Sequence, residues 1–115
     1  MIRKTRTISW IKAARKDFEE FPAGAQVICL TALTIAAENG MPDIAKPLKG
    51  LGSGVIEIAL PWRGNALRLV YALQLGEEIW VIHAFQKKST QGIKTPSHEI
   101  ELIRKRIKRL KEMLG

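Results

Sequence analysis

Three basic residues in the second half of the chain have a spacing that could create a phosphate-binding site. Arg68 lies in an apolar run typical of a strand, and Lys87 and Lys88 follow a second such run. If these runs pair as antiparallel strands joined at residues 76–77, Arg68 lies roughly opposite Phe85 and its end of the strand lies near Lys87. One guanidinium and two ammonium groups gathered there would bind a phosphate.

Ordinary structural roles are open to the same residues. Arg68 could form a strand ion pair with Glu57 or Glu78, and the two lysines could belong to a solvated loop. Arg63 lies in the turn that precedes the Arg68 strand, and we expect it at the far end of that strand's neighbour or on the rim of the site.

The charge of the chain indicates a polyanionic partner. Nineteen Lys and Arg residues against eleven Asp and Glu residues give a formal net charge of +8. Residues 86–115 contain nine of the basic residues and only three acidic ones. Basic residues near a helix C-terminus complement the helix dipole, but this does not explain the lysines that precede the helix. Binding of phosphates would account for them, because it releases condensed counterions.

The order of periodic segments predicts an α+β fold in a single domain spanning residues 1–115. Ser9 and Thr95 are the expected N-caps of the first and last helices, and Pro96 is expected at the first helical position. We expect an N-terminal strand joined to a three-stranded antiparallel meander, a two-helix hairpin and a C-terminal helix. The segments are a strand at 2–8, helices at 10–21 and 25–39, a loop at 41–54, strands at 55–60, 66–75 and 79–85, a loop at 86–94 and a final helix.

Two helices carry recognisable apolar positions. In the second helix these are Val27, Leu30, Thr31, Leu33 and Thr34, and in the last helix they are Ile100, Ile103, Ile107, Leu110 and Leu114.

Cysteine and histidine usage argues against metal chemistry. Cys29 is the only cysteine and lies in an apolar run, so we expect a buried, unreactive thiol and no disulfide within the chain. His83 lies inside a strand and is expected in the core or in a cross-strand pair. With His98 it gives too few ligands for zinc, and we expect no metal and no cofactor. There is no apolar run long enough for a membrane span and no signal peptide, which favours the cytoplasm.

Several short motifs resemble the RelE/ParE toxin superfamily, and most closely its HigB-like, phage-derived group. The resemblance runs from about residue 44 to the C-terminus, and the order of the preceding helices agrees with it. Its most specific part is the phrase HAFQKKS followed by IKTP and a glutamate. The motifs are Lys49–Leu51, Leu67–Tyr71, His83–Lys88, Lys94–Pro96 and Glu99–Leu102.

The resemblance implies a toxin of a type II toxin–antitoxin system. Relatives of the RelE and HigB kind cut messenger RNA in the ribosomal A site without a metal and so inhibit translation. The implied partners are the ribosome, messenger RNA and an antitoxin, often a helix-turn-helix protein, through which alone the toxin meets promoter DNA. Relatives of the ParE kind instead inhibit DNA gyrase. A third hypothesis is that the chain is a non-catalytic basic RNA-binding module.

Catalytic roles follow from this resemblance. Arg68 would grip the scissile phosphate, while Lys87 and Lys88 would stabilise the charge that develops on it. His98 stands roughly where relatives have a tyrosine and could transfer a proton. Glu57 stands where RelE relatives place lysines. It could therefore be the general base, or the chemistry could instead depend on the loop with Lys46 and Lys49 and on Lys87 and Lys88.

Further residues could hold the RNA strand. Lys46 and Lys49 lie in the predicted 41–54 loop, and Lys94 precedes the last helix. Trp62, in a predicted turn, could stack on a base, and Arg63 beside it could contact a phosphate.

Overall fold

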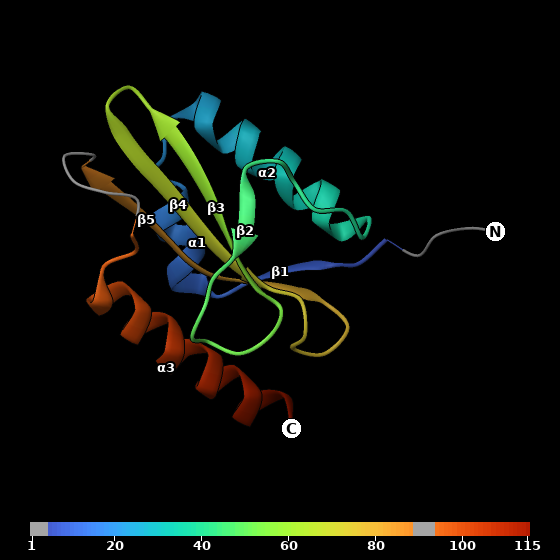
Figure 1. Cartoon of the computed structure of the whole chain (residues 1–115). Coiled ribbons are helices and arrows are strands. Elements are labelled where there is room, and N and C mark those ends of the chain that lie inside the picture. The colour runs from blue at the N-terminus through green and yellow to red at the C-terminus, as the bar shows by residue number, and fades with distance from the viewer. Residues whose placement is uncertain (1–4, 89–93) are drawn as a thin grey trace.

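Five strands form one mixed sheet in the order β1-β5-β4-β3-β2 (Figure 1). The structure, a computed structural model, describes residues 5–88 and 94–115. It confirms the predicted α+β fold, including the three-stranded meander joined to the first strand. The strands are β1 (Ile8–Trp10), β2 (Ala45–Pro47), β3 (Val55–Trp62), β4 (Asn65–Ala72) and β5 (Ile79–Lys88), and the helices are α1 (Lys12–Phe18), α2 (Ala23–Ala37) and α3 (Ser97–Leu114).

The first strand pairs in parallel with the last one. Ile8 lies opposite Ile79, and Trp10 lies opposite Val81. This pairing corrects two predictions: residues 5–7 are not in the strand, which runs from Ile8 to Trp10, and Ser9 belongs to it instead of capping a helix. Residues 2–4 of the predicted strand at 2–8 lie outside the described residues. The first helix therefore begins only at Lys12.

The connections between the strands differ in how well the sequence predicts them. Arg63 and Gly64 both have positive φ angles, 49° and 82°, which is the type I′ turn that suits a two-residue hairpin. The connection between β4 and β5, residues 73–78, is longer than the predicted hairpin. The predicted 41–54 loop contains β2, whose Pro47 lies at a sheet edge, where a missing N–H is tolerated.

Helices cover both faces of the sheet (Figure 1). Helices α1 and α2 pack on one face, where their apolar side chains meet Ile56, Ile58 and Leu69. Helix α3 packs on the other face, where its apolar side chains meet Val55, Val70 and Ile82. Alternation along β3 and β4 therefore assigns their buried apolar side chains to one of two cores. None of the described helices has both the length and the apolar composition that a membrane crossing requires.

Helix α2 buries a different face from the one that the sequence predicted. Of the predicted apolar positions only Leu33 is buried, whereas the side chains of Val27 and Leu30 are exposed. The helix is apolar all round, so the spacing of its large side chains could not identify the buried face. Small residues let the helix backbone lie close to the sheet, and the buried set is Ala25, Cys29, Ala32, Leu33, Ala36 and Ala37.

Helix α3 agrees better with its pattern. Ile103, Ile107 and Leu110 are buried, as predicted, but Leu114 is exposed. The helix begins at Ser97 with Pro96 as the N-cap residue, so the predicted cap at Thr95 is wrong. The hydroxyl of Thr95 is used elsewhere, as described below.

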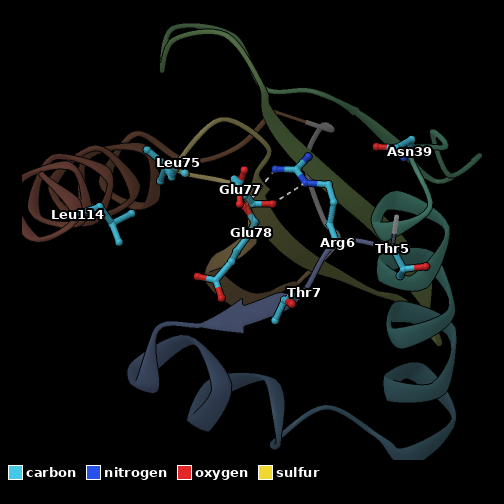
Figure 2. A pocket seen from close by; sticks show the side chains of 9 residues that line it. Thr5, Arg6, Thr7, Asn39, Leu75, Glu77, Glu78 and Leu114 are labelled. Carbon is cyan, nitrogen blue, oxygen red and sulfur yellow. Dashed lines mark hydrogen bonds between the residues drawn. The ribbon is translucent and has the colours of Figure 1, made fainter. Parts of the chain in front are cut away.

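A surface hollow of about 860 Å³ lies beside the β4–β5 connection and has a structural explanation (Figure 2). The guanidinium of Arg6 donates to the backbone oxygens of Leu73, Glu77 and Glu78. These bonds connect the segment before β1 to the β4–β5 connection. The arginine in this hollow therefore serves the fold, with its Nε and Nη2 atoms bonded to backbone oxygens.

The packing of α2 can be tested with two substitutions of the same kind. Leu33→Ala removes a fully buried side chain, so we expect it to lower the free energy of unfolding by about 2–5 kcal/mol. Leu30→Ala, on the exposed face of the same helix, should cost less than about 1 kcal/mol. Urea unfolding followed by circular dichroism measures both. Equal costs would show that the helix face is assigned wrongly.

Candidate functional site

A buried ion pair lies on the sheet face that α3 covers. The Nη1 atom of Arg68, on β4, donates to Oε1 of Glu57, on β3, at 2.8 Å. Arg68 is 4% exposed and Glu57 is 1% exposed. The other carboxylate oxygen of Glu57, Oε2, accepts a 2.6 Å hydrogen bond from the Thr95 hydroxyl. Of the two ion pairs that the sequence allows for Arg68, with Glu57 or with Glu78, the structure contains the pair with Glu57.

The strand register brings predicted site residues around this pair. Arg68 lies opposite Phe85, as predicted, and Lys87 lies one step further along the same face, opposite Ala66. Lys46, on β2, lies opposite Glu57 and is exposed. Directly opposed residues share a sheet face. Two lysines therefore flank the buried pair from neighbouring strands.

Lys87 connects the sheet to the segment before α3. Its Nζ atom donates to the backbone oxygen of Lys94 at 2.7 Å. Lys87 lies within β5, so the prediction of a loop from residue 86 is wrong at this point. Lys88 is the last residue of the strand, opposite Asn65, and its side chain lies outside what the structure describes. The exposed Lys94 lies next to Thr95, which caps the ion pair.

A second polar cluster fastens the start of α3 to the sheet. Nε2 of His83 lies 2.8 Å from Oε1 of Glu99, and Nδ1 lies 3.0 Å from Nη1 of Arg106. A guanidinium can only donate, so Nδ1 accepts and the ring carries its proton on Nε2, which donates to Glu99. A β-bulge aims this histidine: Val70 pairs with His83 and Tyr71 with Val81, which leaves Ile82 as the extra residue.

Contacts made by Thr95 and by Glu99 close the start of α3 over the ion pair. Thr95 contacts Glu57 from one side, and Glu99 holds the first turn of the helix against His83. The Phe85 ring stacks on His83 at a centroid distance of 5.1 Å and lies opposite Arg68. In this arrangement a phosphate in solvent cannot contact Arg68. A surface hollow of about 470 Å³ beside Lys87, Lys94 and Thr95 is the nearest place for one.

The remaining predicted residues lie further from the pair. The side chain of His98 is 79% exposed, and its Nε2 atom lies 3.7 Å from Glu99. Lys49 is exposed in the turn after β2. Neither residue contacts Arg68 or Glu57 among the hydrogen bonds and ion pairs that the structure describes.

The other two lie at the β3–β4 connection: Trp62 is the last residue of β3, not part of the turn as predicted, and Arg63 is in the turn. Trp62 packs with the core under α1 and α2, so close to the start of α2 that a Cβ on Gly24 would lie 2.9 Å from its ring. Its side chain therefore faces away from the Arg68 side of the sheet. Arg63 is exposed, and since Asn65 pairs with Lys88 its turn lies beside the end of β5; of the two predicted places, the far end of the neighbouring strand is wrong, and a place on the rim stays a prediction.

Two groups outside the site have perturbed acidities. Burial raises the pKa of the Cys29 thiol to about 11 and the pKa of the Tyr71 hydroxyl to about 12. The predicted burial of Cys29 is confirmed, and so is that of His83. Within residues 5–88 and 94–115, no three His, Cys, Asp or Glu side chains are grouped closely enough to hold a metal ion.

The sequence reasoning missed the contacts made by Thr95, Glu99 and Arg106. A signal for two of them was present, because Glu99 and Arg106 are seven residues apart and share a helix face with Ile103. Polar residues in line with a buried apolar stripe need a buried polar partner, and His83 is the strand residue that could supply it.

Comparison with known proteins places the chain among related folds. Residues 16–108 match the family model described as phage-derived protein Gp49-like (DUF891). The structure is similar to that of a mutant of the E. coli toxin RelE in the free state, with a TM-score of 0.62 and 18% identity over 91% of this chain and 97% of that one. It is also similar to a chain of the toxin–antitoxin complex RelBE2 from Mycobacterium tuberculosis, with a TM-score of 0.51 and 16% identity over 73% of this chain and 93% of that one. No curated protein matches the chain significantly. At these identities the structural likeness establishes the fold.

A double-mutant cycle tests the buried pair. Arg68→Met leaves the Glu57 carboxylate buried without its partner and should lower the free energy of unfolding by about 3–5 kcal/mol. The double variant Glu57→Leu/Arg68→Met should cost less than Arg68→Met alone, because no uncompensated charge remains. The exposed pair Arg15–Glu19 is the control: Arg15→Met should cost under about 1 kcal/mol. Additive effects of the two site substitutions in urea unfolding would contradict the coupling.

The reactivity of the Cys29 thiol tests whether this residue is buried as the structure shows. With a pKa of about 11, only roughly one Cys29 thiol in a thousand is ionised at pH 8, whereas an unfolded chain has an ordinary thiol. Alkylation by iodoacetamide at pH 8 should therefore be at least about 100-fold slower in the native protein than in guanidinium chloride. Mass spectrometry reads the single site directly. Similar rates in both solutions would mean that α2 does not shield this residue.

Proposed function

Because this chain belongs to the phage-derived Gp49-like family and has a RelE-like fold, we propose that it is a toxin of a toxin–antitoxin system that cleaves messenger RNA. One observation carries the catalytic part of the proposal: Arg68 and Glu57 are paired on the sheet face where Lys87 and Lys46 also lie. An arginine, a carboxylate and lysines side by side are the groups that metal-free RNA cleavage needs.

The chemistry assigns each group a task. The 2′-hydroxyl of the RNA attacks the adjacent phosphate, and the Glu57 carboxylate accepts its proton. The Arg68 guanidinium holds the phosphate, and Lys87 stabilises the negative charge of the phosphorane. As the bond to the 5′-oxygen breaks, that oxygen takes a proton from His98 or Lys87. Lys88 and Lys94 extend the cationic surface along the strand of RNA.

The closed arrangement requires one change before RNA can bind. Thr95 occupies one oxygen of Glu57, and Lys87 holds the backbone of Lys94 against the sheet. RNA would replace these two contacts as it enters from the hollow next to Thr95. Two hydrogen bonds are a modest cost, on the order of 1 kcal/mol each when they are exchanged for bonds to a ligand.

The partners follow from the same proposal. One similar structure is of a toxin–antitoxin complex, and we propose an antitoxin partner for this chain as well, of the helix-turn-helix kind. The antitoxin, and not this chain, would contact promoter DNA. The ribosome would present the messenger RNA, which places the activity in the cytoplasm.

One observation favours a second candidate function. Arg68 and Glu57 are almost fully buried, as expected of residues that stabilise the fold. If they never open, the chain acts by binding, either as a basic RNA-binding module or as a toxin of the gyrase-inhibiting kind. Cleavage and action by binding alone predict different products in the cell.

Brief induction of the chain in bacteria distinguishes them. We expect growth arrest accompanied by new 5′ ends in messenger RNA, mapped by sequencing of RNA ends. Lys87→Met keeps the aliphatic stem of a half-buried side chain and removes its charge, so it should lower cleavage by about 100-fold or more. Lys108→Met, on the exposed face of α3, is the matched control and should cleave normally.

Other outcomes would reject the cleavage proposal. Growth arrest with intact transcripts and a DNA-damage response would support gyrase inhibition. Normal growth with salt-sensitive RNA binding would support the RNA-binding module. Full cleavage by Lys87→Met would remove Lys87 from the site.

A further inference from the structure

A groove with an apolar floor lies between the start of α1 and the part of α3 from Leu102 to Met113. We call it the α1–α3 groove. Trp10, Trp80 and Leu102 contribute to its floor, and Met113, which is 75% exposed, lies at its end. Its volume of about 670 Å³ is within the range of roughly 300–1,000 Å³ that is typical of ligand sites. An exposed methionine beside half-buried tryptophans is an apolar surface that water contacts unfavourably.

The rim of the groove is basic. Lys12, Lys105 and Arg109 line it, and none of them forms an ion pair within the described residues. A fourth lining residue, Arg106, is already bonded to His83 and to the backbone oxygen of Ile82. No acidic side chain is among the residues that line the groove. A ligand that fits must therefore bring negative charge together with apolar groups.

The spacing of the rim indicates the shape of the ligand. Lys105 and Arg109 are four residues apart on α3, so they are neighbours along one face of the helix. Leu102 and Met113 extend the same face in both directions. A second helix lying alongside α3 would present acidic side chains at the same four-residue spacing and apolar side chains to the floor.

The surroundings of Trp10 argue against RNA as the ligand. Binding of single-stranded RNA uses open aromatic faces on which bases stack. The Trp10 ring already contacts Phe18, at a centroid distance of 5.0 Å, and the Arg15 guanidinium lies 5.7 Å from its centroid. Trp10 therefore offers the ligand apolar contact instead of an open stacking face.

We propose that the α1–α3 groove binds an acidic amphipathic helix of a protein partner. Its apolar side chains fill the groove over Leu102 and Met113, and its carboxylates pair with Lys105 and Arg109. The groove lies along α3 from Leu102 to Met113, whereas Thr95 and Glu99, which close over the ion pair, lie at or before the first turn of the helix. This inference concerns binding and does not depend on RNA cleavage.

The test uses a synthetic 16-residue helical peptide with leucines on one face and glutamates four residues apart on the other, followed by fluorescence anisotropy. The double variant Lys105→Glu/Arg109→Glu should weaken its binding at least tenfold. The control Lys108→Glu/Lys111→Glu makes the same change of net charge on exposed positions of the same helix that do not line this groove. It should change binding less than twofold. Thermal melts check that both variants fold.

A second measurement needs no charge reversal. In the wild-type protein, the methyl resonance of Met113 should shift when the peptide is added, whereas that of Met41, exposed outside this groove, should not. The proposal fails if the peptide does not bind, if both double variants weaken it equally, or if Met113 is unaffected. It also fails if the peptide is inert while a single-stranded RNA oligonucleotide binds in a manner that Lys105→Glu/Arg109→Glu abolishes.

Discussion

The ion pair between Glu57 and Arg68 is the constraint around which one side of the protein is arranged. Two opposite charges removed from water are costly unless they are paired and their remaining hydrogen-bonding groups are satisfied. For the carboxylate the structure meets this requirement with Thr95, whose hydroxyl donates to the second oxygen of Glu57. Thr95 lies two residues before α3, so satisfying the carboxylate also determines where the last helix begins.

The same constraint explains how function and stability meet in one place. The groups proposed to handle a phosphate are also groups whose burial holds β3, β4 and the α3 segment together. Two polar contacts near the start of α3 are made to side chains on the sheet, by Thr95 to Glu57 and by Glu99 to His83. The proposed entry of RNA therefore replaces a contact that lies two residues before the helix.

The sequence predicted the fold well and the site partially. Alternation of apolar residues along β3, β4 and β5 located the meander, and the register between Arg68 and Phe85 followed from it. Helix α2 was assigned the wrong buried face, because small and large apolar residues surround it on all sides. The three residues of β2 carry too little periodicity to be recognised.

Among the site residues too, positions fixed by strand pairing were predicted, whereas contacts that depend on helix packing were not. Arg68, Glu57 and Lys87 lie next to one another because strand pairing is regular and can be counted along the chain. The contacts of Thr95, and of Glu99 with His83, depend on how α3 is placed over the sheet and on the bulge at Ile82. Local spacing indicates that Glu99 needs a buried polar partner, but it does not contain the placement of α3 that selects His83 or brings Thr95 to Glu57. The turn after Trp62 was recognised, but the direction of the indole depends on its packing against α2.

The parallel pairing of β1 with β5 has a consequence for the time at which the molecule becomes complete. Synthesis proceeds from the N-terminus, so β1, α1 and α2 exist before the strand with which β1 pairs. The apolar side of α2 then has no sheet to cover, and α3, which supplies Thr95 and Glu99, is made last. Contacts between such distant segments form slowly. A nascent chain therefore carries an open, unfinished site, and closure over Glu57 and Arg68 belongs to the final stage of folding.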